Sequence, residues 1–367
     1  MIGITGSAGK TTTRHATAHL LRALGGSVHA SHGNLNNFIG APMSLLGLAD
    51  DHTVGVIEIG MNQPGEIATL ASVVEPTIAI VTLVSHAHTA GVGSLWGVAR
   101  EKSDLVAALP PSGVCIVNAD VPFAAAAAVR TQARLRLSYG ASATASVRLV
   151  RRRALSLEKS ALTIELNLGG PRRELEAEVR LLGDAGASAC LAAVCAALAV
   201  HGPELPPEEL SRGLAAIAPN EPGRLDVTRR RDGAIIINDA YNANPASMKS
   251  SIRTAREIAS LEGLQLVLVL GTMFELGKDA DVQHQEVGQA AAEADPATLV
   301  VVGEGARLIE RGFESKSDRP TRWVKDAGEA ETDLATFDLS KSVVLVKASN
   351  SMGLGSVAAR LASKGSP

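Results

Sequence analysis

A glycine-rich segment near the start of the chain carries residue types that bind phosphate. The segment ITGSAGKTTT, residues 4–13, follows a short apolar run and opens a stretch with helical character. Gly6 and Gly9 would let backbone N–H groups close around phosphate oxygens, and the N-terminus of the helix would add a partial positive charge. Lys10 can reach the outer phosphates of a nucleotide, and the hydroxyl of Thr11 can bind Mg²⁺. The strict pattern begins with a further glycine where this chain has isoleucine, but the expected strand, loop and helix context is present.

Three other segments carry side chains that could act beside bound phosphates. Glu58 closes an apolar run, where a carboxylate is costly to bury unless it meets a cation, so it is a candidate Mg²⁺ ligand; an ion-paired or helix-capping carboxylate is the alternative. His86 and His88 follow the run at 78–84 and point the same way, because residues two apart in an extended chain share a face. Taken alone, each histidine is expected to be structural, and Lys102 is expected to be an exposed helical lysine.

Short apolar runs that alternate with helical stretches would position these side chains. Continuous apolar strands separated by helices are typical of parallel sheets with both faces covered, which predicts an α/β fold. The runs lie at residues 1–5, 54–59, 78–84, 114–117, 235–237, 264–270, 299–302 and 343–346.

The pattern changes between residues 146 and 182, where apolar and polar residues alternate on either side of a glycine-rich turn. This alternation predicts an antiparallel hairpin with one solvated face. The turn-rich segment at 219–223 marks a domain boundary. We expect a phosphate-loop domain over residues 1–220, with a doubly wound, mostly parallel sheet and an antiparallel patch. A smaller Rossmann-like α/β domain would follow over residues 221–367.

The composition excludes several classes of partner. The 35 basic and 38 acidic residues give a net charge of -3, so no global field attracts nucleic acid or an anionic membrane. The three cysteines lack metal-ligand spacing and are expected to be reduced buried thiols. The longest apolar run, 187–200, is shorter than the roughly 20 residues that span a bilayer. The N-terminus lacks a signal-type segment, which predicts a cytoplasmic location.

A series of motifs in fixed order resembles the Mur ligase family, most closely the type that adds D-alanyl-D-alanine to a UDP-N-acetylmuramoyl tripeptide. The resemblance extends over nearly the whole chain. It is carried by TGSAGKTTT, by GNLNNFIGAP at 33–42, EIGMNQPGEI at 58–67, HTAGVGSLWGVAREKSD at 88–104, VNAD at 117–120, GRLD at 223–226, NDAYNANPASM at 238–248, GTMFELG at 271–277 and VKASNSM at 346–352.

The resemblance implies an ATP-dependent reaction that uses two Mg²⁺ ions. Lys10 and Thr11 would hold the ATP phosphates and the first ion, with Glu58 as a further ligand. His88 would bind the second ion, and Lys102 would be carbamylated by CO₂ to help place it. The phosphate loop would comprise Gly6, Ser7, Ala8, Gly9, Lys10, Thr11 and Thr12.

The resemblance also assigns substrate and nucleotide contacts elsewhere in the chain. Arg224 would approach the nucleotide phosphates. The base and ribose would meet Asp239, Tyr241, Asn242 and Asn244. The carboxylate substrate would face Asn34, Asn36 and Asn37, and the amine-binding domain would contribute Lys347, Ser349 and Asn350. The implied reaction activates a carboxylate as an acyl phosphate, and an amine then displaces phosphate to form an amide.

The chain departs from the family pattern in several places. The family carries an N-terminal domain that binds the UDP handle, whereas Met1 here begins the strand before the phosphate loop. We therefore expect that domain to be absent: either another polypeptide supplies it, the start is truncated, or the substrate carries no UDP-sugar. GDAGASA at 183–189 replaces a Gly-x-His-Asn-x-x-Asn element. Asn350 and Thr272 stand where the family usually has arginine and aspartate.

Three functions follow from these observations. The leading expectation is a ligase that joins a carboxylate not carried on UDP to an amino acid or dipeptide in a biosynthetic pathway. The first alternative is the peptidoglycan ligase itself, in a truncated or two-chain form in which a separate protein presents the substrate. The second is a catalytically inactive nucleotide-binding partner, against which the retained phosphate-loop and metal-site residues argue.

Overall fold

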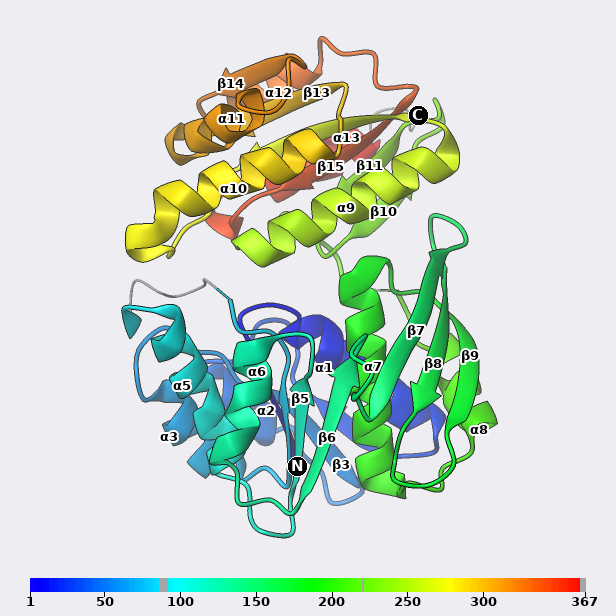
Figure 1. The fold of residues 1–367 in the computed structure, drawn as a ribbon. Helices are drawn as coiled ribbons and strands as arrows, with labels where there is room; N and C mark the ends of the chain where they lie inside the picture. Colours follow the sequence, from blue (N-terminus) through cyan, green and yellow to red (C-terminus); the bar gives the residue numbers. More distant parts are fainter. Residues whose placement is uncertain (86–91, 220, 364–367) are drawn as a thin grey trace. The chain divides into compact units, whose positions relative to one another are not determined.

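The computed structural model describes residues 1–85, 92–219 and 221–363 of the chain. The chain forms two compact units (Figure 1). The first unit comprises Met1–Leu155 and Lys159–Pro219, and the second comprises Ser156–Glu158 and Asn220–Pro367. Each unit is built around its own sheet.

A nine-stranded sheet forms the first unit, in the order β2-β3-β1-β4-β5-β6-β7-β8-β9. The pairs from β2 to β7 are parallel, and β7, β8 and β9 are antiparallel. The predicted hairpin is confirmed as β8 and β9, with β7 as a third antiparallel strand. The strands are β1 (Ile2–Thr5), β2 (Val28–Ala30), β3 (Val54–Glu58), β4 (Ile78–Val81), β5 (Val114–Asn118), β6 (Leu135–Gly140), β7 (Val147–Ala154), β8 (Ser160–Leu166) and β9 (Arg173–Val179).

Helices cover both faces of this sheet because successive strand residues point to opposite sides. Ile2 and Ile4 pack into a core shared with α1, α7 and α8, whereas Ile57 and Ile59 pack into a core shared with α3, α5 and α6. The helices are α1 (Lys10–Ala23), α2 (Gly40–Leu45), α3 (Glu66–Val74), α5 (Leu95–Ala107), α6 (Pro122–Ala127), η1 (Ala128–Arg130), α7 (Gly183–His201) and α8 (Pro207–Ala215).

The helix α7 is long and apolar enough to cross a membrane by length and composition. Most of it is buried, and it packs against α1. A buried helix of this kind is the core helix of a globular domain, as predicted for its apolar run.

The second unit has a six-stranded sheet in the order β10-β11-β15-β12-β13-β14, parallel except for β10 (Figure 1). Helices α12 and α13 pack on one face, and α9 and α11 contact strands from the other. The strands are β10 (Asp226–Arg229), β11 (Ile235–Asn238), β12 (Gln265–Gly271), β13 (Thr298–Val302), β14 (Thr321–Val324) and β15 (Ser342–Lys347). The helices are α9 (Pro245–Glu262), η2 (Gly277–Asp279), α10 (Ala280–Glu293), η3 (Glu304–Ala306), α11 (Arg307–Glu314), α12 (Ala327–Leu334), η4 (Asn350–Met352) and α13 (Leu354–Ser363).

Candidate active site

The phosphate loop joins β1 to α1 in a conformation that requires glycine. Gly9 is the N-cap of α1 with φ 81°, and no side chain caps the first turn, so its backbone N–H groups face outward as an anion site. Gly6 has φ 156°, and a Cβ built on it would lie 1.9 Å from the hydroxyl oxygen of Thr82. A side chain at position 6 would therefore displace the loop.

Neighbouring segments fix the loop in place. The Ser7 backbone N–H donates to the Leu83 carbonyl at 2.6 Å, and the Ser7 hydroxyl donates to the Ser85 carbonyl at 3.1 Å. The Thr82 hydroxyl donates to the Ala8 carbonyl at 2.7 Å. Lys10 Nζ donates to the Gly6 carbonyl at 2.9 Å, so its ammonium lies back across the loop where phosphate oxygens would bind.

Thr11, in the first turn of α1, contacts Glu58, the last residue of β3. The Thr11 hydroxyl donates to Glu58 Oε2 at 2.8 Å, and Asn36 Nδ2 donates to Glu58 Oε1 at 2.8 Å. Thr11 is 3% exposed and Glu58 is 2% exposed. The structure therefore brings together three of the residues that the sequence singled out, from α1, from β3 and from the segment before α2.

Arg14 is a further member of this cluster, which the sequence reasoning missed. It lies on α1, is 5% exposed, and its Nε is 3.7 Å from Glu58 Oε2. Its guanidinium also donates to the Ser31 carbonyl, and the Ser31 hydroxyl accepts from the Glu58 backbone N–H at 3.1 Å. The only available signal was its position three residues after Thr11, on the same face of an amphipathic helix.

Lys102 is buried in α5 rather than exposed, which corrects the expectation from its sequence neighbourhood alone. It is 1% exposed, and none of the ion pairs among the described residues includes it. Burial first, and then the nearby Lys10 ammonium, lowers the pKa of Lys102 well below its ordinary value, while Glu101 raises it. Burial therefore favours the neutral amine of Lys102 over the ammonium. His86 and His88 lie outside the described residues.

The described residues fit a magnesium ion at Thr11 and Glu58. Mg²⁺ prefers oxygen ligands and is usually held by one or two carboxylates together with substrate phosphates. The Thr11 hydroxyl and the Glu58 carboxylate are such oxygens, beside a loop shaped for phosphate. Within residues 1–85, 92–219 and 221–363, no group of three or more His, Cys, Asp or Glu residues could hold a metal by itself. The donor set therefore fits an ion that is shared with a nucleotide.

The three asparagines that were predicted to face the carboxylate substrate, Asn34, Asn36 and Asn37, make different contacts. Asn36 reaches Glu58, and its carbonyl accepts from the Gly60 backbone N–H at 2.7 Å. Asn37 Oδ1 accepts from the backbone N–H groups of Ile39 and Gly40, which stabilises the start of α2. Asn34 is exposed. Asn36 is thus the member of this loop that contacts the candidate metal site.

In the second unit, Asp239 and Lys347 form a buried ion pair. Lys347 Nζ lies 2.6 Å from Asp239 Oδ2 and also donates to the carbonyl of Asn242 at 3.0 Å. Asp239 accepts from the Ser251 hydroxyl and from the Leu225 backbone N–H. These two predicted ligand-contacting residues therefore hold together the loops after β11 and β15.

The predicted nucleotide-binding residues Arg224 and Tyr241 contact each other. The Arg224 guanidinium carbon lies 4.0 Å from the centre of the Tyr241 ring, and both side chains are half-buried. Asn244 is the N-cap of α9, where it forms a capping box with Ser247. Asn242 is exposed, and its Oδ1 accepts from the next backbone N–H. Arg224, Tyr241 and Asn242 thus have side-chain surface left for a ligand.

Ser349 and Asn350 follow β15 at the carboxyl edge of the second sheet. The Ser349 hydroxyl accepts from the Phe274 backbone N–H at 3.1 Å, which ties this loop to the loop after β12. His284 Nε2 accepts from the Met273 backbone N–H at 3.0 Å, and burial lowers the pKa of His284. Asn350 is exposed. Ligands of open α/β sheets bind at such carboxyl edges.

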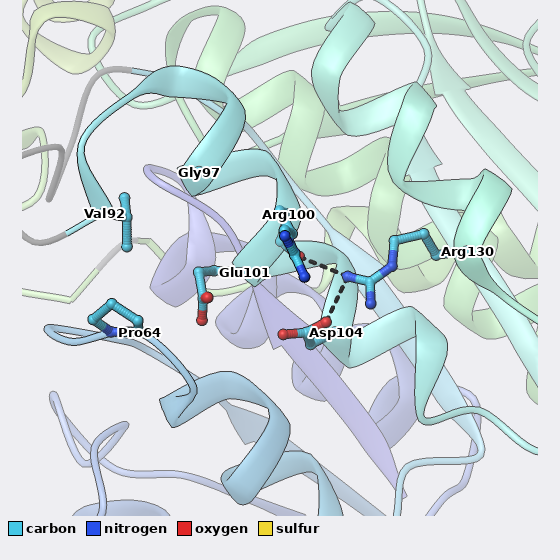
Figure 2. Close-up of a pocket in the computed structure, with 7 residues that line it drawn as sticks. All are labelled: Pro64, Val92, Gly97, Arg100, Glu101, Asp104 and Arg130. Carbon is cyan, nitrogen blue, oxygen red and sulfur yellow. Dashed lines mark hydrogen bonds and ion pairs between the residues drawn. The ribbon is translucent and has the colours of Figure 1, made fainter.

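A polar cavity of about 400 Å³ lies beside α5 in the first unit (Figure 2). Arg130 Nη1 donates to the Ser103 hydroxyl at 2.7 Å and to Asp104 Oδ1 at 2.5 Å, and Glu101 Oε2 accepts from the Gly65 backbone N–H at 2.7 Å. None of these residues was predicted from the sequence to line a site. The lining residues are Pro64, Val92, Gly97, Arg100, Glu101, Asp104 and Arg130.

Comparison with known protein families matches both units. Residues 4–197 match the Mur ligase middle domain, and residues 223–350 match the Mur ligase glutamate ligase domain. The UDP-N-acetylmuramoyl-tripeptide–D-alanyl-D-alanine ligase of Mycobacterium tuberculosis is 35% identical over 381 residues, which covers 98% of this chain and 72% of the relative. The ligase of the same name from Escherichia coli is 32% identical and covers 84% of this chain and 66% of the relative.

Solved structures share the fold of the whole described chain. MurF from Acinetobacter baumannii superposes with a TM-score of 0.85 at 27% identity, over 98% of this chain and 76% of that protein. The MurF ligase from Thermotoga maritima, solved in complex with ADP, has a TM-score of 0.82 at 23% identity, over 99% of this chain and 79% of that one.

Proposed function

This chain belongs to the Mur ligase family, and we propose that it joins D-alanyl-D-alanine to a UDP-N-acetylmuramoyl tripeptide with cleavage of ATP. It is an ATP-dependent ligase that forms amide bonds. The leading expectation from the sequence, a carboxylate that is not carried on UDP, finds no support in the comparisons. The alternative, the peptidoglycan ligase, agrees better with relatives that bear this name at 35% and 32% identity.

The contact between Thr11 and Glu58 is the single observation that carries the proposed chemistry. It places a hydroxyl and a carboxylate, 2.8 Å apart and buried, at the base of a loop whose backbone N–H groups can bind phosphates. When bound there with ATP, Mg²⁺ would neutralise charge on the β- and γ-phosphates. Thr11 and Glu58 would hold that ion, and Lys10 would turn from the Gly6 carbonyl to the outer phosphate.

The first half-reaction transfers the γ-phosphoryl group to the substrate carboxylate. A carboxylate oxygen bonds to the γ-phosphorus, the bond to the β–γ bridging oxygen breaks, and ADP leaves with that electron pair. The products are ADP and an acyl phosphate. Because two anions approach each other, the loop N–H groups and the Lys10 ammonium lower the barrier by offsetting their repulsion. Asn36, whose amide donates to Glu58, would help to orient the incoming carboxylate.

Lys102 would act in this site as a carbamate. A neutral amine adds to the carbon of CO₂ and loses a proton, which converts the side chain into an anionic oxygen ligand suited to Mg²⁺. The lowered pKa of Lys102 supports this assignment, because the amine that reacts is the unprotonated one. Together with His88, the carbamate would hold the second metal ion.

The second half-reaction uses the amine of D-alanyl-D-alanine. Its nitrogen bonds to the acyl carbon, the tetrahedral intermediate collapses, and phosphate leaves while the nitrogen loses a proton. Arg224, Tyr241 and Asn242 retain side-chain surface that could contact the nucleotide. Asn350 is exposed and could contact the amine substrate. Asp239 and Lys347 would position these loops rather than touch the substrate. Since the reaction uses ATP and a nucleotide-linked precursor, we place it in the cytoplasm.

A coupling assay tests this function. The chain is incubated with ATP, Mg²⁺, D-alanyl-D-alanine and either the UDP-N-acetylmuramoyl tripeptide or a panel of free carboxylic acids and peptides. We expect phosphate release and a pentapeptide product, measured by mass spectrometry, with the UDP-linked substrate. Coupling only with carboxylates that lack UDP would contradict this proposal and support a ligase whose substrate is not carried on UDP. Turnover only after a second polypeptide is added would indicate a separate substrate-presenting protein.

A further inference from the structure

Arg14 faces the same carboxylate oxygen that accepts the Thr11 hydroxyl. Its Nε lies 3.7 Å from Glu58 Oε2, and its Nη1 donates to the Ser31 carbonyl. The Ser31 hydroxyl in turn accepts from the Glu58 backbone N–H. The segment after β2, the end of β3 and the first turns of α1 therefore hold the guanidinium and the carboxylate in one fixed arrangement.

The charges of this cluster cancel. Arg14 is 5% exposed and Glu58 is 2% exposed, so water screens neither group well. The Arg14 guanidinium carries a positive charge. Within residues 1–85, 92–219 and 221–363, the Glu58 carboxylate also accepts hydrogen bonds from the neutral side chains of Thr11 and Asn36. Glu58 is thus compensated by a resident cation of the protein.

We propose that Arg14 couples metal binding to nucleotide binding at this site. A divalent cation that entered beside Thr11 and Glu58 alone would meet the Arg14 charge in a site with no net anion to offset it. The phosphates of ATP supply the missing negative charge, so the metal binds together with the nucleotide. This inference rests on the metal site at Thr11 and Glu58 that we proposed above.

Removal of the Arg14 charge should turn the cluster into a site for free metal. Glu58 would then be a buried carboxylate without a cation, beside the Thr11 hydroxyl, whose oxygen can also bind a metal ion. Arg14→Gln keeps a side-chain N–H donor but removes the charge. Arg14→Lys keeps the charge. The pair of variants separates electrostatics from loss of packing.

The test is titration with Mn²⁺, which replaces Mg²⁺ and whose free form is counted by electron paramagnetic resonance. Without nucleotide, we expect Arg14→Gln to bind Mn²⁺ ~10-fold or more tightly than the unmodified chain. Arg14→Lys should behave as the unmodified chain does. In the double variant Arg14→Gln/Glu58→Gln the gained binding should disappear. Circular dichroism checks the fold of each variant.

Two results separate the failure of this inference from the failure of the metal site. If Arg14→Gln binds free Mn²⁺ no more tightly than the unmodified chain, the role of Arg14 is wrong and the metal site stands. If Glu58→Gln takes up Mn²⁺ with a non-hydrolysable ATP analogue as well as the unmodified chain does, the metal site itself is wrong. The unmodified chain gives an independent check: tight binding of Mn²⁺ without nucleotide would overturn the coupling.

Discussion

Thr11 and Glu58 are 47 positions apart in the chain, and the hydroxyl of Thr11 donates to Glu58 Oε2 at 2.8 Å. The register of the sheet explains this contact. β1 and β3 are parallel neighbours in which Ile4 pairs with Glu58, so Glu58 ends its strand beside the start of the phosphate loop. α1 then returns Thr11 over the same edge. The pairing of two strands therefore assembles the metal site.

Replacement of Glu58 by glutamine should lower catalysis strongly. Because it also leaves the buried Arg14 guanidinium without its carboxylate, the fold of the variant is checked by circular dichroism before activities are compared. Glutamine can still accept from Thr11, but its neutral amide is a poor ligand for Mg²⁺. We expect kcat for phosphate release to fall on the order of 10²-fold or more. Glu165→Gln on β8, a carboxylate in the antiparallel patch that pairs with Arg148, is the matched control and should retain activity. Equal activity of Glu58→Gln and the control would remove Glu58 from the mechanism.

Gly6→Ala should destroy nucleotide binding. A Cβ at this position would lie 1.9 Å from the Thr82 hydroxyl oxygen, at a backbone φ of 156°. Thr82 or the loop must move to relieve that clash, which disturbs the backbone N–H groups that would bind phosphate. Gly170→Ala serves as control, because a Cβ there meets nothing within 4 Å. Calorimetric titration with an ATP analogue should show binding to the control alone, and normal binding to Gly6→Ala would contradict the loop assignment.

Lys102→Met should make the protein more stable at neutral pH. The pKa of Lys102 lies well below 10.5 in the folded state, so between that pKa and about 10.4 the unfolded chain binds one more proton. The stability of the unmodified chain therefore rises with pH across this window, by up to about 1.4 kcal/mol per pH unit. The free-energy cost of burying the Lys102 ammonium is fully present below the pKa of Lys102 in the folded state, and it vanishes at about pH 10.4.

Urea unfolding in CO₂-free buffer between pH 7 and pH 10 measures this effect. The free energies of unfolding of Lys102→Met and of the unmodified chain should differ most at the low end of this pH range and converge as the pH rises. A difference that does not change with pH would contradict a depressed pKa. With ¹³C-labelled bicarbonate, the unmodified chain should show a carbamate carbon resonance that Lys102→Met lacks.

Lys347→Met should destabilise the second unit strongly. It leaves the Asp239 carboxylate buried without its cation, which costs about 3–5 kcal/mol. The exposed pair of Arg319 and Asp295 gives the contrast, since Arg319→Ala should cost less than about 1 kcal/mol. In a Trp96→Phe background the remaining tryptophan, Trp323, reports on the second unit. If Lys347→Met and Arg319→Ala unfolded at the same midpoint urea concentration, the structural role of Lys347 would be contradicted.

The fold class was predictable because its strands are strongly apolar. Runs such as 78–84 and 343–346 are buried on both faces and correspond to β4 and β15. The missed strands are short or polar: β7 contains Arg151, Arg152 and Arg153, and β10 is largely exposed at the edge of its sheet. In such strands tertiary pairing decides the structure, and local hydrophobicity carries little information.

The site was predictable where a motif defines local geometry, as in the phosphate loop. The contact of Glu58 with Thr11 required the strand register, and the burial of Lys102 required the packing of α5, so the sequence alone left both open. Arg14 lacked any motif signal. Asp239 and Lys347 were singled out as ligand contacts, and only the three-dimensional arrangement showed that they bind each other.

The most direct test of the account follows one oxygen atom. The UDP-N-acetylmuramoyl tripeptide is labelled with ¹⁸O in its reacting carboxylate, coupled to D-alanyl-D-alanine with ATP, and the released phosphate is analysed by mass spectrometry. An acyl phosphate intermediate predicts that each amide formed transfers one ¹⁸O from the carboxylate to inorganic phosphate, with ADP as the other product. Unlabelled phosphate, or release of AMP and pyrophosphate, would contradict the proposed ligase mechanism.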